Sequence, residues 1–441
     1  MNPNTNSFKK TAGVYGVVGA AAAAIAFYGC SSSSGSPVTP VGDDSGTDAT
    51  TPVGGDGSTT TPPKDSGPAT TPDGGDAGTP AATLQKVTQT NLFADTDAGG
   101  APKVDPLLKN AWGLAFNPSG PAWVSDNHSG VATLYSTTGG GAILGLVVQV
   151  PLPDGGGGPL YPALDSGSNS SPTGQIFNAS ATVPDAGTTS DFLGDVFIIS
   201  AEDGTISGWA SSLVDKTKAT LRVDMSSASA SFKGLQIIPS TPPILLAADF
   251  HNAKIDAFDT SYAPITADAG AGKWTDSTLP AGYAPYNIYA TSTSVFVSYA
   301  KQDAQAADDQ EGDGFGAVSV FDLTGTLVKS LIKVAPSNGL DGPWGMTTVP
   351  AGGWGSLPEG ALLVGNFEGG AIHAFDPTSG AMLATFALST GAPLSIDGLW
   401  ALTWGPNTPQ AADAGTLPTQ LFFTAGPNGE DNGLYGYLTA P

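Results

Sequence analysis

From about residue 110 to the C-terminus one short pattern recurs six times, and this repeat constrains the fold more than any other feature. The clearest copy begins at Asn110-Ala-Trp-Gly-Leu114 and continues through Trp123-Val-Ser-Asp126 to Tyr135. Repeats of short alternating strands at such a period are typical of a radial array of four-stranded blades. The openings of the copies, 53 to 61 residues apart, are Trp112, Thr173, Lys233, Tyr286, Trp344 and Trp400.

Each copy contains three segments that we predict to be strands. The first starts at the step before a glycine (112–116), the second is an apolar run that ends polar (244–249), and the third ends in an aromatic residue (254–258). A fourth, outer strand is less distinct. The segment Lys86–Phe93 is also expected to be a strand, which would close the ring by pairing with the last copy. The sequence thus predicts an all-β, six-bladed β-propeller over residues 84–441.

The first thirty residues have the pattern of an export signal. Lys9 and Lys10 precede an apolar stretch at 14–28, which is short for a membrane span, and the small residue Gly29 precedes Cys30. We predict a lipoprotein-type signal peptide at 1–30 with Cys30 as the lipidation site, which places the protein outside the cytoplasm on an outer membrane or cell surface. The alternative is an uncleaved signal anchor with an incidental thiol.

Residues 31–83 are rich in Ser, Thr, Pro, Gly and Asp and nearly free of large apolar side chains. We predict a disordered linker because such a segment buries too little surface to offset its ordering entropy. The chain carries a net charge of −24, which argues against nucleic acid as a partner and against binding to an anionic membrane face. Contact with the membrane is therefore expected through the lipid anchor alone, with the protein a monomer.

In a propeller, the connections that lead into the innermost strands lie at the same end as the turns between the second and third strands. Large side chains stand where the connections lead into the innermost strands. They are expected to ring the mouth of the central channel, where aromatic rings can stack on sugars or flat apolar groups. The alternative is that they plug the channel. The ligand-rim candidates are Trp112, Lys233, Tyr286, Trp344 and Trp400.

The turns between the second and third strands hold acidic residues and two of the three histidines of the chain. Convergent His and carboxylate side chains are the ligands of divalent metals, so a bound cation (calcium or another) is one interpretation. The alternative is that Asp, Asn and Ser at these turns bond their own backbone. The metal candidates are His128, Glu202, Asp249, His251, Glu368 and Glu430.

The fourth copy carries a longer, acidic turn. Its carboxylates are interleaved with glycine and are candidates for a calcium loop, although their spacing does not match an EF-hand. A solvated lid loop is the alternative. The calcium-loop candidates are Asp308, Asp309, Glu311 and Asp313. No hydrolase, phosphate-loop or zinc-protease motif occurs, so no catalytic residue is predicted, and His373 is expected to be structural.

Several sequence words resemble a family of secreted bacterial proteins known as conserved hypotheticals, some of which end in a PEP-CTERM type sorting tail. This resemblance implies a propeller but no activity. Each copy also resembles the NHL repeat. The matching words are Asn110-Ala-Trp-Gly-Leu114, Ala201-Glu-Asp-Gly-Thr-Ile-Ser-Gly-Trp209, Ala248-Asp-Phe-His-Asn-Ala-Lys-Ile-Asp256, Leu279-Pro-Ala-Gly-Tyr-Ala-Pro-Tyr-Asn-Ile288, Tyr299-Ala-Lys-Gln-Asp303, Ile396-Asp-Gly-Leu-Trp400 and Phe423-Thr-Ala-Gly-Pro-Asn-Gly429.

Two functions remain open at this point, together with a purely structural role in the envelope. The first is a binding or display module whose ligand is an envelope protein or a glycan. The second is a metal-dependent hydrolase of lactonase or phosphoesterase type, in which an ion on the top face activates a water or polarises an oxygen. The absence of a catalytic motif favours the first.

Overall fold

The computed structural model describes residues 82–118, 120–136, 142–154, 170–182, 190–265, 273–405 and 419–441. The predicted signal segment, Cys30 and nearly all of the predicted linker lie outside these residues. Within them the regular structure is β-strand with a few short 3-10 turns. In this described part of the chain no helix is long and apolar enough to cross a membrane.

The described strands form five hydrogen-bonded sheets. Three sheets have four strands each, in sequence order from the centre outward, and one has three strands. The four-stranded sheets are β2 (Ala111–Phe116) to β3 (Ala122–Asp126), β4 (Val131–Tyr135) and β5 (Val148–Gln149); β6 (Pro172–Phe177) to β7 (Phe197–Ala201), β8 (Thr205–Trp209) and β9 (Thr220–Asp224); and β13 (Tyr283–Ala290) to β14 (Val295–Lys301), β15 (Gly316–Phe321) and β16 (Leu327–Ile332). The three-stranded sheet is β10 (Phe232–Ile238), β11 (Ile244–Asp249) and β12 (Lys254–Phe258).

The fifth sheet has eight strands and contains both ends of the described chain. Its strands are β17 (Pro343–Thr348), β18 (Leu362–Asn366), β19 (Ile372–Phe375), β20 (Met382–Leu388), β1 (Thr83–Ala94), β23 (Leu434–Thr439), β22 (Leu421–Ala425) and β21 (Leu399–Trp404), in that order. The short 3-10 turns are η1 (Asp97–Gly99), η2 (Asn127–Ser129), η3 (Ala179–Thr182), η4 (Asp191–Gly194), η5 (Ser226–Ala228) and η6 (Glu368–Gly370).

Strand β1 joins the first part of the described chain to its last part. Its second half, from Thr88 onward, pairs antiparallel with β23, which is the pairing expected from the sequence. Its first half, from Thr83 to Val87, pairs in parallel with β20, which the sequence did not predict. The strand also begins three residues before the predicted segment at Lys86. Through β1, the last two groups of strands become one continuous sheet.

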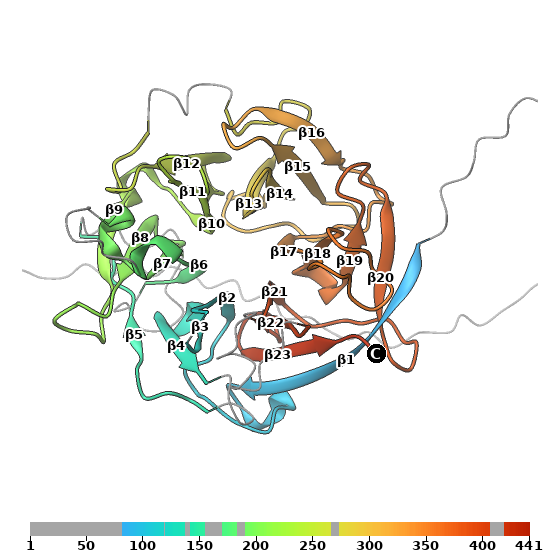
Figure 1. Ribbon diagram of the computed structural model, residues 1–441, viewed down its shortest axis with the longest axis horizontal. Coiled ribbons are helices and arrows are strands. Elements are labelled where there is room, and N and C mark those ends of the chain that lie inside the picture. The colour runs from blue at the N-terminus through green and yellow to red at the C-terminus, as the bar shows by residue number, and fades with distance from the viewer. Residues whose placement is uncertain are drawn as a thin grey trace, which may run out of the picture. The chain divides into compact units, whose positions relative to one another are not determined.

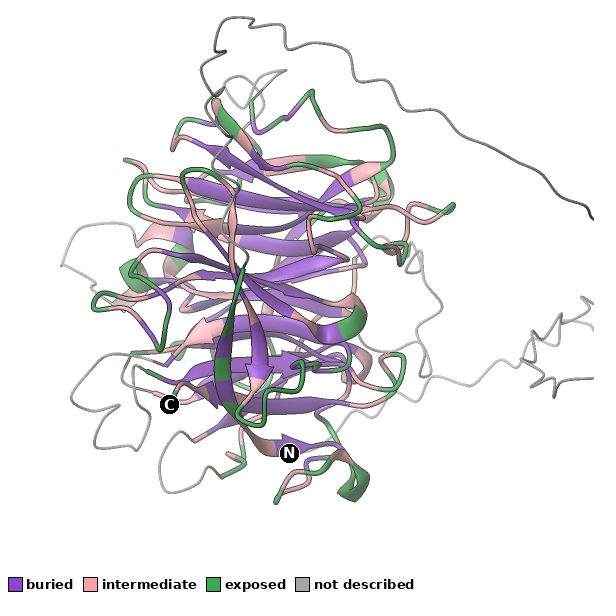
Figure 2. Cartoon of the chain, turned by 90° about the vertical axis from the view of Figure 1, so that its right-hand side faces the viewer, coloured by how far each residue is buried: buried purple, intermediate pink, exposed green. Residues whose placement is uncertain are grey.

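The innermost strands of the sheets stand around a common axis (Figure 1). Strand β2 contacts β6, β6 contacts β10, and the series continues through β13, β17 and β21 back to β2. Because the inner strands close on themselves and the sheets radiate from them, the described part of the chain has the arrangement of a β-propeller. The faces of neighbouring sheets pack on each other, as where Trp123 of β3 stacks on Phe197 of β7 with ring centroids 4.1 Å apart. Buried residues follow the strands, while most exposed residues lie in the connections (Figure 2).

The repeated opening pattern marks a β-bulge in each innermost strand. The pairing of β2 with β3 shifts register between Ala111 and Leu114, and the other five innermost strands shift at the equivalent step. A bulge bends a strand and re-aims its side chains, here towards the axis. Four of the six strands have a glycine at this step, where neighbouring inner strands approach closely. A Cβ on Gly113 would lie 2.3 Å from the carbonyl oxygen of Thr173 in β6.

Candidate functional site

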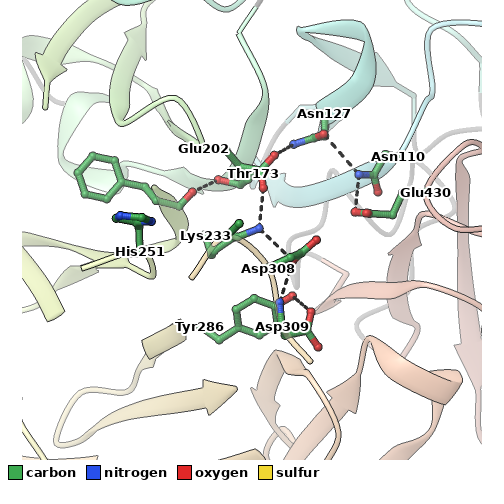
Figure 3. A network of polar contacts seen from close by, with 12 residues as sticks. Asn110, Asn127, Thr173, Glu202, Lys233, His251, Tyr286, Asp308, Asp309 and Glu430 are labelled. Carbon is green, nitrogen blue, oxygen red and sulfur yellow. Dashed lines mark hydrogen bonds and ion pairs between the residues drawn. The ribbon is translucent and has the colours of Figure 1, made fainter. Parts of the chain in front are cut away.

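The starts of the innermost strands and the connections after β3, β7, β11, β14 and β22 meet at one end of the ring, as predicted from the repeat (Figure 3). Polar side chains from these segments form a connected set of hydrogen bonds and ion pairs, which we call the polar network. Its members are Asn110, Asn127, Glu202, Lys233, Tyr286, Asp308, Asp309 and Glu430.

Lys233 of β10 provides the positive charge of the polar network. Its side chain is fully buried, and its Nζ lies 2.5 Å from Oε1 of Glu202 and 3.2 Å from Oδ1 of Asp308. The same ammonium lies 5.0 Å from the ring centroid of Trp112 and 5.8 Å from that of Phe250. Two carboxylates and two aromatic faces therefore offset the cost of burying this charge.

Two asparagines connect the carboxylates on the other side of the polar network. The Nδ2 of Asn110 donates to Oε1 of Glu430 at 2.8 Å, and its Oδ1 accepts from the indole nitrogen of Trp400 at 2.8 Å. The Nδ2 of Asn127 donates to Oε2 of Glu202 at 3.0 Å. Asn110 has a φ of +45°, a left-handed conformation that asparagine adopts more readily than most residues.

The long connection between β14 and β15 brings two adjacent carboxylates into the polar network. Asp308 accepts from Lys233, while Oδ1 of Asp309 accepts from the hydroxyl of Tyr286 at 2.7 Å. The other two members of the predicted calcium loop, Glu311 and Asp313, are exposed. Asp308 and Asp309 therefore lie in the polar network while Glu311 and Asp313 lie on the surface, so the four candidates do not face one point.

Burial and mutual repulsion raise the pKa of several carboxyls at this end of the ring. Burial, with the charges of Asp308 and Glu202, raises the pKa of Glu430 to about 8. Burial and the charge of Asp308 raise the pKa of Asp309 to about 7. Burial and the charges of Glu311 and Asp341 raise the pKa of Glu368 to about 7. These groups hold protons near neutral pH because they are buried and because negative charge is in excess around them.

The ligand-rim candidates do not stand at an exposed mouth. Trp112 and Trp400 are buried and stack with ring centroids 3.6 Å apart, and Trp344 packs edge-on against both. Tyr286 and Lys233 are also buried. The bulges point these side chains at the axis, where they meet and fill the channel below the polar network. The indole nitrogens of Trp112 and Trp344 are buried without a hydrogen-bond partner among the described residues.

The metal candidates lie in different environments. Glu202 and Glu430 belong to the polar network, and Glu368 lies close enough for the charge of Asp308 to raise its pKa. Asp249 is fully buried and accepts from the backbone N–H groups of Ser231 and Asn252, so it holds a turn. This is the role that the turn interpretation predicts for its position.

The two candidate histidines lie at the edge of this region. The Nδ1 of His251 lies 3.1 Å from the carbonyl oxygen of Ala306, and His128 is half-buried in η2. His373 of β19 has its Nδ1 3.0 Å from Oγ1 of Thr385, and burial lowers its pKa. Among the residues that the structure describes, no three His, Cys, Asp or Glu side chains are grouped so as to hold a metal ion.

Sequence reasoning missed the two asparagines and the partner of Lys233. Asn110 stands in the first repeated word, and Asn127 lies between two positions that were compared across the repeats. Lys233 was assigned to the ligand-rim candidates and Glu202 to the metal candidates, although one ion pair joins them. The alignment of the copies indicated that these segments meet, and this was the only sign in the sequence that their side chains could be in contact.

No family model matches the chain. It is 27% identical over 366 residues to the uncharacterized protein R648 of Acanthamoeba polyphaga mimivirus, a match that covers 81% of each protein. Among solved structures it is similar to virginiamycin B lyase from Staphylococcus aureus, with a TM-score of 0.44, 10% identity, and coverage of 81% of this chain and 99% of that one. It is also similar to the Pan2 WD40 domain of Neurospora crassa, with a TM-score of 0.42, 10% identity and coverage of 81% and 97%.

Proposed function

We propose that this chain is a lipid-anchored, extracytoplasmic binding module built on a six-bladed β-propeller, and that its ligand presents an amine or guanidinium cation to the polar network. The six-blade count is supported by the cycle of contacts among six innermost strands, with the eight-stranded sheet counted as two blades joined through β1. The anchor is supported by the signal-like segment that ends at Cys30 and by the linker after it.

The observation that carries the proposal is the position of the Lys233 ammonium. This cation lies between the carboxylates of Glu202 and Asp308 and over the ring of Trp112. Carboxylates on two sides and an aromatic face on another are the surroundings that an organic cation needs in a binding site. The polar network thus already accommodates one ammonium group of the chain itself.

The carboxylates at this end of the ring carry more negative charge than the single ammonium of Lys233 can neutralise. Glu430, Asp309 and Glu368 keep raised pKa values, and the carboxylates around them are the main charged cause of each shift. A second cation placed among these groups would reduce the repulsion and favour their ionised forms. The Oδ2 atom of Asp309 is buried and has no hydrogen-bond partner among the described residues, so it retains an unused acceptor.

We favour an organic cation over a divalent metal. The ammonium of Lys233 occupies the space between Glu202 and Asp308, where an ion would need both carboxylates. A ligand of this class is a protein with exposed lysine or arginine, which agrees with the envelope partner expected from the sequence. Recognition would then rest on charge-assisted hydrogen bonds to carboxylates, which are stronger than neutral ones.

Calorimetric titration of the full-length protein in detergent with spermidine tests the proposal. The parent is expected to bind, and Glu430→Gln is expected to bind about tenfold more weakly at pH 9, a loss of about 1.4 kcal/mol. Asp215→Asn removes the same charge from an exposed ion pair between β8 and β9 and serves as the control. Equal affinities for the parent and Glu430→Gln at pH 9, or an equal loss in the control, would contradict a site at the polar network.

A further inference from the structure

A second site lies on the axis of the ring, on the other side of the buried tryptophans. There the innermost strands surround a cavity of about 440 Å³, and residues of all six strands line it. The lining begins at the bulges, as at Gly174 of β6 and Trp344 of β17, or directly after them, as at Leu114 of β2. A cavity of this size falls within the range of small-molecule sites in proteins.

The wall of this cavity carries no charge. No Asp, Glu, Lys, Arg or His is among its described lining residues, although the whole chain carries a net charge of −24. Its amide and hydroxyl side chains are neutral and include those of Gln175, Gln236, Asn287, Thr347 and Thr403 on five different strands. An ion inside would lose its hydration without gaining a partner charge, so the wall selects an uncharged molecule.

Aromatic side chains mark the end of the cavity that opens to solvent. Phe116, Phe177, Tyr289 and Trp404 line the cavity near the ends of their strands, and each is only half-buried. The lining residues next to the bulges, including Gly174 and Trp344, are buried. A ligand therefore enters past aromatic rings, which favour flat ring systems by stacking and edge contacts.

One polar side chain of the wall is incompletely hydrogen-bonded. Gln175 of β6 is 8% exposed, and its Oε1 accepts from the hydroxyl of Ser125 at 2.8 Å. This bond leaves Nε2 as the free end of the amide, and Nε2 has no hydrogen-bond partner among the described residues. An unsatisfied buried N–H is unfavourable. Nε2 is shielded from solvent, so a ligand oxygen would accept from it once the amide turns towards the cavity, and this bond would remove the penalty.

We infer that this cavity binds an uncharged, ring-containing small molecule that carries a carbonyl oxygen. The ring system lies among the aromatic and aliphatic side chains of the wall, and the oxygen accepts from the amide of Gln175. This site is separate from the polar network, because Trp112, Trp344 and Trp400 pack together between them. The inference therefore goes beyond the proposed cation site and does not depend on it.

Ligand-observed NMR titrations of the full-length protein with three naphthalenes of similar size test the inference. The ketone 2-acetylnaphthalene is expected to bind. The hydrocarbon 2-ethylnaphthalene is expected to bind about tenfold more weakly because it lacks the acceptor, and the anion 2-naphthoate is expected not to bind. Spermidine is expected not to displace the ketone, and displacement would show that the two sites are one.

Variants locate the binding. Gln236→Trp fills the cavity and loses no hydrogen bond that the side chain makes to a described residue, so it is expected to abolish ketone binding with the fold retained by circular dichroism. Gln175→Leu is expected to remove the preference for the ketone over the hydrocarbon. Ser125→Ala is the control, since it removes the bond to Oε1 and leaves Nε2 in place. Unchanged ketone binding in Gln236→Trp, or binding of 2-naphthoate equal to that of the ketone, would overturn the inference.

Discussion

The ammonium of Lys233 lies 2.5 Å from Oε1 of Glu202, and the other oxygen of this carboxylate accepts from Nδ2 of Asn127. One carboxylate after β7 therefore contacts the innermost strand of the next sheet in the chain and the turn η2 of the preceding one. The carboxylate of Glu202 therefore links three neighbouring sheets through one ion pair and one hydrogen bond.

Removing the charge of Lys233 is expected to destabilise the fold strongly. Lys233→Met leaves Glu202 and Asp308 without their cation, and the loss of one partner of a buried ion pair costs about 3 kcal/mol or more. Because Asp308 is 42% exposed, solvent screening reduces its share of that loss. Urea unfolding measures the effect. Lys218→Met, in an exposed pair with Asp215, is the control and should lose far less; equal losses would refute the role of burial.

Stability should fall as the pH rises from about 5 to 8. The folded-state pKa of Glu430 is about 8, above the ordinary value of 4.5, so the folded protein holds a proton that the unfolded chain has already released. Folding is therefore less favourable at higher pH, by about 3 kcal/mol across this window. Glu430→Gln cannot ionise and should show a flatter curve of unfolding free energy against pH. A parent that gains stability over this range would contradict the prediction.

Gly345, at the opening of the fifth copy, should not tolerate a methyl group. Gly345→Ala would place a Cβ 2.5 Å from the carbonyl oxygen of Trp400, so two innermost strands must separate, at a cost of about 1–3 kcal/mol. Gly145→Ala is the matched control, since a Cβ there meets nothing within 4 Å. Thermal melts of both variants check the prediction, which fails if the two lower the Tm equally.

Divalent metals should leave the thermal midpoint unchanged. The organic-cation site proposed here does not require one, whereas a metal-dependent hydrolase should be stabilised by about 2.7 kcal/mol when its ion is present at one hundred times its Kd. Melting curves in chelator and then in Ca²⁺, Mg²⁺, Mn²⁺ or Zn²⁺ distinguish the two. A rise with a single ion would favour the hydrolase and would call for assays with lactones and phosphoesters.

The attachment of the protein to a membrane should depend on Cys30. Cys30→Ser removes the thiol to which acyl chains would be joined, and the apolar segment before it is short for a span. Fractionation of cells is expected to find the parent with membranes and the variant in the soluble fraction. A variant that stays with the membranes would support the uncleaved signal anchor instead.

The repeat predicted the propeller-type fold because each copy marks a physical requirement. The six openings fall at six bulges, and four of them have a glycine where inner strands approach too closely for a side chain, while the fourth copy has Asn287 and the sixth has Ala401. The exposure of Trp112 and Trp400 could not be predicted in the same way. It depends on how far the bulges turn these rings towards the axis, where they meet a partner from another copy.

The site was predicted only in part, for a related reason. Comparing the copies by position brought Glu202, Glu430 and Lys233 to one end of the ring. The comparison treated residues at the same position in different copies as equivalent. The contacts follow side-chain length and direction instead. Asn127 therefore enters the polar network beside His128, and Asp308 reaches Lys233 from an insertion that no other copy has.

The pairing of strand β1 determines how the ring would respond to a force applied from its N-terminal side. It is held along its length, in parallel with β20 over its first half and antiparallel to β23 over its second. A force applied to the chain before Thr83 would act along this strand, so both rows of hydrogen bonds would be sheared together instead of opening one by one. If the protein is tethered at its N-terminus, tension therefore reaches the joint between the two ends of the ring first, and resistance to pulling is determined there.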